Sequence, residues 1–181
     1  MKFTWMIVAA ALTLLAGSSA GDAPQKIGYA NMAKVADGVD NTFRGLWPEF
    51  QAEPIGVAQF IYIRGYGAVI SAKLNMAPGN SVTPFHPQIT KDDKASTRKM
   101  KQDRMPVLKA AMLDLLAKSA AQLRDVPDNE EIALGVTLFY WHWEDRTDLP
   151  DQVVMHATKK ALLAAGQDKA ALTAAVRSEA F

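Results

Sequence analysis

The sequence predicts an α+β fold in which a four-stranded antiparallel sheet, built from two hairpins, packs against an N-terminal helix, a long central helix and a C-terminal helix. Three observations lead to this fold class. Residues 56–76 are rich in β-branched and aromatic side chains around a glycine-containing turn. Residues 106–124 carry apolar side chains at the helical period, and residues 131–143 form a further apolar, strand-like segment. Hairpins make antiparallel pairs, so this order of elements favours an α+β arrangement.

The turn of the first hairpin is Arg64-Gly65-Tyr66-Gly67. A turn centred on its two middle residues places its first and last residues opposite each other and places Ile61 opposite Ile70. Side chains alternate between the faces of a strand, so one face should point into the core. On that face we expect Val57, Ile61, Ile63, Ala68, Ile70, Ala72, Leu74 and Met76.

The first twenty residues have the pattern of a signal peptide. Lys2 is followed by an apolar run over residues 3–15 and by small residues up to Ala20, after which we expect cleavage. The apolar run is short for a membrane span, which takes about 20 residues. We therefore expect an exported protein, periplasmic or extracellular, that is soluble after cleavage, with residues 21–181 as one α+β domain.

The composition narrows the function classes. There is no cysteine, so the exported domain has no disulfide and depends on hydrophobic burial. Removing Lys2 with the signal peptide leaves 20 − 1 = 19 basic residues against 19 acidic ones. This balance argues against a nucleic-acid partner.

The remaining elements follow from periodicity and from residues that start or stop helices. Apolar spacing predicts a helix over residues 30–47, and prolines mark residues 77–90 as a connection. Thr90 opens a capping box for a helix that Pro106 interrupts or restarts. Residues 152–158 fit either a strand or a helix, and we predict a strand paired with residues 131–143. A helical turn over residues 159–165 and a last helix capped by Asp168 complete the chain.

Residues 62–69, Tyr-Ile-Arg-Gly-Tyr-Gly-Ala-Val, resemble the Tyr-x-x-Gly-Tyr-Gly-x-Val turn of a family of exported bacterial proteins of unassigned function. The resemblance extends in outline over most of residues 47–181, and its specific motif is the turn. Arg64 stands where that family is expected to have proline. The resemblance implies the fold and the export of the chain, and it implies no activity.

Two clusters are candidate binding sites. At the turn, the exposed amides beside Arg64 are suited to holding an anion or a carboxylate, although Gly65, Tyr66 and Gly67 are equally explained by the needs of a hairpin. At the end of the third strand, Trp141 and Trp143 on one face could stack on a sugar ring, with Glu144 and Asp145 as a carboxylate pair. The structural alternative is that these aromatic residues pack in the core. The candidate residues of this second cluster are Trp141, His142 and Trp143.

The histidines are His86, His142 and His156, and none is spaced like a pair of metal ligands, so we expect no metal and no cofactor. His86 remains a candidate binding residue because it lies in the proline-rich connection. The basic residues of segment 91–104 are expected to be a solvated helix face.

From these features we expect a binding or accessory domain without catalytic activity, with a small molecule or a protein as its partner. The alternative is a small periplasmic hydrolase that uses His86 or His142 with Asp145.

Overall fold

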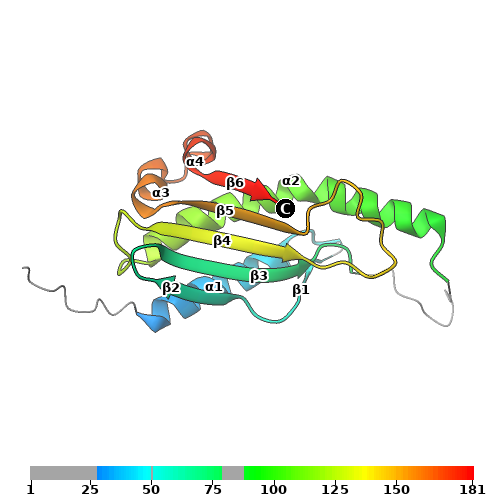
Figure 1. Cartoon of the computed structure of the whole chain (residues 1–181), viewed down its shortest axis with the longest axis horizontal. Helices are drawn as coiled ribbons and strands as arrows, with labels where there is room; N and C mark the ends of the chain where they lie inside the picture. The colour runs from blue at the N-terminus through cyan, green and yellow to red at the C-terminus, as the bar shows by residue number, and fades with distance from the viewer. Residues whose placement is uncertain (1–27, 50, 79–87) are drawn as a thin grey trace, which may run out of the picture.

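The computed structural model describes residues 28–49, 51–78 and 88–181. The predicted signal peptide and His86 lie outside these residues. The helices are α1 (Tyr29–Gly45), α2 (Lys91–Gln122), α3 (Lys159–Ala165) and α4 (Lys169–Ala175). The strands are β1 (Glu53–Pro54), β2 (Gln59–Ile63), β3 (Gly67–Asn75), β4 (Glu131–Leu138), β5 (Gln152–Thr158) and β6 (Arg177–Ala180) (Figure 1).

The strands form one mixed sheet, so the α+β class is confirmed but the purely antiparallel four-stranded sheet is wrong. β1 and β2 both pair with one edge of β3, and the order continues through β4 and β5 to β6. β2–β3 and β4–β5 are antiparallel, as predicted, whereas β3 and β4 are parallel. The reason is that α2 forms a crossover between β3 and β4, and a crossover returns the chain to the same end of the sheet.

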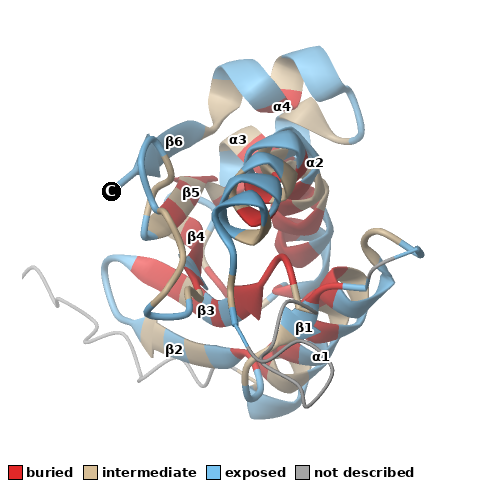
Figure 2. Ribbon diagram, turned by 90° about the vertical axis from the view of Figure 1, so that its right-hand side faces the viewer, coloured by how far each residue is buried: buried red, intermediate tan, exposed pale blue. Residues whose placement is uncertain are grey.

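The helices lie on one face of this sheet (Figure 2). α1 and α2 supply the buried residues Val39, Phe43, Leu108, Met112 and Leu116, which pack against the alternate inward residues of β3, β4 and β5. α3 and α4 pack beside α2 and each contributes one buried leucine. Among the described residues no helix covers the opposite face, which we call the open face.

α2 is a single helix of 32 residues with Pro106 inside it, so the predicted interruption at the proline is wrong. Its start is as predicted, because the Thr90 side chain accepts from the Asp93 amide and Asp93 accepts from the Thr90 amide. The solvated basic face predicted for residues 91–104 is only partly correct, because Lys91, Lys94 and Lys99 are exposed but two other basic residues of this segment are buried. The side chain of Lys101 is 1% exposed and Arg104 is also buried.

The hairpin register differs by one residue from the prediction. Ile63, not Arg64, pairs with Gly67, so the loop has three residues and Ile61 lies opposite Val69. The inward assignment is correct for β3 but wrong for β2, where Ile61 and Ile63 are exposed. Positive φ angles at Gly65 and Gly67, 80° and 134°, allow the three-residue loop.

The C-terminal part largely follows the prediction. Residues 152–158 are the strand β5, Asp168 caps α4 through the amides of Ala170 and Ala171, and α3 occupies the predicted residues 159–165. The strand β4 ends at Leu138, five residues before its predicted end, and β6 was not predicted because its four residues are short and polar. No helix within the described residues has the length and apolar character needed to cross a membrane.

Candidate functional site

The Arg64–Gly67 turn already holds a carboxylate of the protein. Glu130 is buried immediately before β4, and its Oε1 accepts hydrogen bonds from the Gly65 amide at 3.0 Å and from the Tyr62 hydroxyl at 3.2 Å. Burial, together with the hydrogen bond to Glu130, raises the pKa of the Tyr62 phenol, so this group is a donor at neutral pH. The anion at the Gly65 amide is therefore the carboxylate of Glu130, a residue of the protein itself.

The other members of the turn separate into backbone and side-chain roles. A Cβ on Gly67 would overlap the backbone of Glu131, so only glycine allows β3 and β4 to begin side by side here. Arg64 and Tyr66, by contrast, project into solvent. Arg64 thus presents a free charge at the end of β2, where it makes no ion pair with another described residue.

The predicted aromatic cluster lies in the loop after β4. Trp141 and His142 are exposed and Trp143 is half-buried. The Trp141 ring meets the Phe139 ring edge-on, with the ring centres 5.0 Å apart. Since β3 and β4 are parallel, this loop and the Arg64–Gly67 turn lie at opposite ends of the sheet (Figure 1), so the two predicted sites are not brought together.

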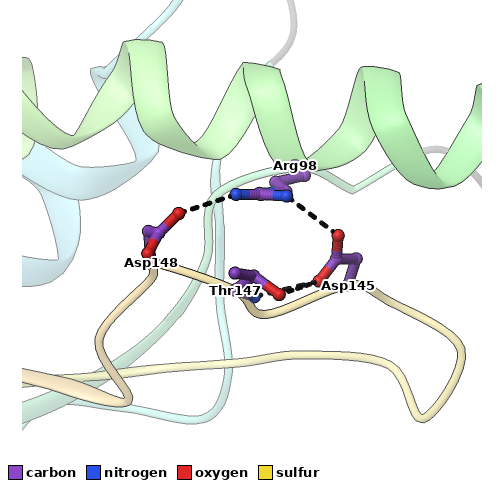
Figure 3. A network of polar contacts seen from close by, with 4 residues as sticks. All are labelled: Arg98, Asp145, Thr147 and Asp148. Atoms are coloured by element: carbon purple, nitrogen blue, oxygen red, sulfur yellow. Dashed lines mark hydrogen bonds and ion pairs between the residues drawn. The ribbon is translucent and has the colours of Figure 1, made fainter.

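Ion pairs fasten this loop to α2. Arg98 donates to Asp145 at 3.0 Å and to Asp148 at 2.8 Å, and the Thr147 hydroxyl donates to Asp145 at 2.7 Å (Figure 3). The hydrogen bonds from Thr147 and the neighbouring Arg98 lower the pKa of Asp145. Asp145 is therefore held as a carboxylate by a cation and a hydroxyl.

The neighbouring carboxylate of Glu144 is buried and paired as well. Its Oε2 lies 2.5 Å from the Lys101 Nζ, and the two side chains are 2% and 1% exposed. Lys101 also donates to the Phe139 carbonyl at 2.8 Å and lies 4.2 Å from the centre of the Tyr140 ring. Burial lowers the pKa of Lys101, although Glu144 opposes this shift. Glu144 and Asp145 thus contact different cations of α2.

The outer edge of β2 leaves backbone groups without a neighbouring strand. The Ala58 amide donates to the buried carboxylate of Asp40 on α1, at 3.0 and 3.1 Å, and so points away from β3. Backbone direction alternates along an antiparallel pair, so the N–H and C=O groups of Phe60 and Tyr62 also point away from β3. No strand pairs with this side of β2 in the part of the chain that the structure describes.

Apolar side chains accompany this edge. Ile61 is 56% exposed and Ile63 is 47% exposed, both on the open face, and Val57 is exposed just before β2. On the other side of the strand, a groove of about 380 Å³ runs between α1 and β2. We call it the α1–β2 groove. Residues 57–60, at the start of β2 and just before it, line one side, and α1 lines the other with Tyr29, Ala33, Ala36, Asp37 and Asp40.

Sequence reasoning found one residue of this edge, Arg64, and missed the rest. No sequence pattern distinguishes the buried Glu130 and the buried Lys101 from charged residues on the surface. The exposure of Ile61 and Ile63 could have been predicted, because a loop of three residues instead of two moves both side chains to the other face of the strand.

No group of three or more His, Cys, Asp or Glu side chains is placed to hold a metal ion within residues 28–49, 51–78 and 88–181. Of the histidines described, His142 is exposed, and the His156 Nδ1 lies 3.1 Å from the Glu131 Oε2 on the open face. Comparisons of the chain with protein-family models, with curated proteins and with solved structures found no match.

Proposed function

We propose that this chain is an exported binding domain without catalytic activity, and that it receives an extended polypeptide segment along the outer edge of β2. The observation that carries the proposal is that the unpaired edge of β2 and the exposed side chains of Ile61 and Ile63 occur at the same place. Surface patches of this kind mark interaction sites more often than isolated apolar residues do. The pairing of Glu144 and Asp145 with cations supports the non-catalytic part, since both are engaged in fixing a loop.

The mode of binding is strand addition. An extended segment beside β2 would bond to the backbone groups of Phe60 and Tyr62, which gives affinity independent of sequence. Its side chains would alternate between Ile61 and Ile63 on the open face and the α1–β2 groove on the other. Ile61 and Ile63 favour apolar residues on the open-face side of the segment, whereas the groove, which Asp37 and Asp40 also line, suits a mixture of apolar and basic residues.

A peptide library displayed on phage and selected at nanomolar protein concentration tests this function. We expect enriched peptides to be extended and apolar, and to slow hydrogen exchange at the Phe60 and Tyr62 amides. Ile61→Lys should weaken their binding by about tenfold or more. Thr137→Lys, on the open face but away from the edge, is the matched control and should not weaken it. Peptides that bind the Ile61→Lys protein as well as the wild type would contradict the proposal.

A further inference from the structure

We propose that the segment received at the β2 edge is the β2 strand of a second copy of this chain, so that two sheets join about a two-fold axis at Ile61. This inference rests on the proposed function and names its partner. Two copies related by such an axis would pair antiparallel and keep their helices on the same side of the joined sheet.

The register follows from the direction of the backbone groups. Hydrogen-bonded pairs across an antiparallel junction need residues whose backbone groups face outward on both strands. In β2 these residues are Phe60 and Tyr62, since the amide of Ala58 is already bonded to Asp40. An axis at Ile61 pairs Phe60 of each copy with Tyr62 of the other and uses the outward N–H and C=O groups of both residues. The bond to Asp40 then ends the ladder.

The same register buries the exposed apolar side chains. Ile61 of each copy would face Ile61 of the other on the open face, at a non-hydrogen-bonded position where the side chains lie closest. On the helix side, Tyr62 of the second copy would lie opposite Phe60, whose ring already meets the Tyr29 ring at 5.1 Å. Aromatic rings would therefore gather at both ends of the junction.

Charge favours this partner. The register places Arg64 of the second copy opposite Ala58, which lines the α1–β2 groove together with Asp37. Both Arg64 and Asp37 are exposed, and neither makes an ion pair with another described residue. The two-fold axis would form this Arg64–Asp37 pair twice, and complementary charges at an interface rim fix register and orientation.

The other edge of the sheet is unlike β2. All four residues of β6 are exposed, and they include Arg177 and Glu179. Charged side chains on an edge strand are a common means of preventing pairing with another sheet. The apolar edge is therefore the one suited to joining two copies.

Single cysteines test the register directly, because the chain has none of its own. Under mild oxidation, Ile61→Cys should give a disulfide-linked dimer, since the expected Cα separation of about 4.5 Å suits a disulfide. Gln59→Cys and Ile63→Cys should each fail alone but should cross-link when mixed, because the register places one opposite the other. Thr137→Cys on the open face and Ser178→Cys on β6 are the controls and should remain uncrosslinked.

Charge reversal tests the same junction without covalent cross-linking. By sedimentation equilibrium, Arg64→Glu and Asp37→Lys should each weaken the wild-type dimer about tenfold, because each change affects two symmetric pairs. Combining the two reversals in one chain should restore most of the affinity, which a merely structural effect would not do. Circular dichroism should show that all three proteins remain folded.

The outcomes separate the inference from the proposed function. A protein that stays monomeric at about 100 µM, far above the concentration used for selection, while library peptides still bind at β2, overturns the second copy but supports strand addition. Cross-linking through Ser178→Cys instead of Ile61→Cys overturns the choice of edge. Failure of both the dimer and the library peptides would remove the proposed function as well.

Discussion

Replacing Lys101 with methionine should destabilise the protein far more than the same substitution at the exposed Lys99 of α2. The substitution keeps the apolar stem but leaves the Glu144 carboxylate, 2% exposed, without its cation at 2.5 Å. It also leaves the Phe139 carbonyl without the donor at 2.8 Å. Removing one partner of a buried pair typically costs about 3–5 kcal/mol, because the other charge stays buried and uncompensated.

Urea unfolding followed by tryptophan fluorescence measures this free energy, and the double variant isolates the pair. Glu144→Gln removes the second charge but keeps an oxygen for the Trp141 amide, which donates to Glu144 at 3.0 Å. The double variant Lys101→Met with Glu144→Gln should be only about 1–2 kcal/mol less stable than the wild type, mainly from the hydrogen bond lost at Phe139.

Lys99→Met is the matched control on the same helix. Its ion pair with Asp103 at 2.7 Å is largely exposed, with side chains 74% and 62% accessible. It should change the free energy of unfolding by less than about 0.5 kcal/mol. The reasoning fails if Lys101→Met costs no more than Lys99→Met, or if the effects of the two single changes at Lys101 and Glu144 simply add.

Local patterns predicted the elements better than their arrangement. The capping box at Thr90 and the cap at Asp168 are short-range interactions, so the sequence contains all their parts. A run of apolar residues on both faces predicts the strand β4. Val153, Val154 and Thr158 favour a strand over a helix at residues 152–158, and β5 confirms the strand. The parallel pairing of β3 with β4 depends instead on the end of the sheet to which the 32-residue helix α2 returns the chain. No local sequence pattern predicts that return point.

The incorrect register predicted for β2 shows that one additional loop residue determines which side chains of the strand are exposed. Both readings of the turn bury Ile70 and satisfy the preferences of Gly65 and Gly67. The three-residue loop is selected by contacts distant in sequence: Glu130 accepts from Gly65, and Glu131 packs against Gly67. These contacts place Ile61 outside and Phe60 inside, and so they create the apolar edge on which the proposed function depends.

Three further predictions concern Asp145, the isoleucines of the hairpin and the glycines of its turn. Asp145→Asn should lower the stability at pH 7, and this loss should shrink as the pH falls into the acid range. A carboxyl whose pKa is lowered in the folded state adds stability above its unfolded pKa, and this contribution disappears as the pH falls through the folded pKa. A loss in urea melts that does not change with pH would contradict this. Ile70→Ala should cost about 2–5 kcal/mol in a urea melt, whereas Ile61→Ala, at a site 56% exposed, should cost less than about 1, and the reverse order would refute the observed register. Finally, alanine at the two glycines of the turn should separate strain from overlap. Gly65 has a φ of 80° with open space around its Cα, so Gly65→Ala should cost about 1 kcal/mol through backbone strain alone. Gly67 has a φ of 134° and also abuts the Glu131 backbone, so Gly67→Ala must push β3 and β4 apart where they begin, and we expect a loss of about 3 kcal/mol or more, with faster hydrogen exchange in both strands. Equal costs at the two glycines would mean that β3 and β4 are not in close contact at this end of the sheet.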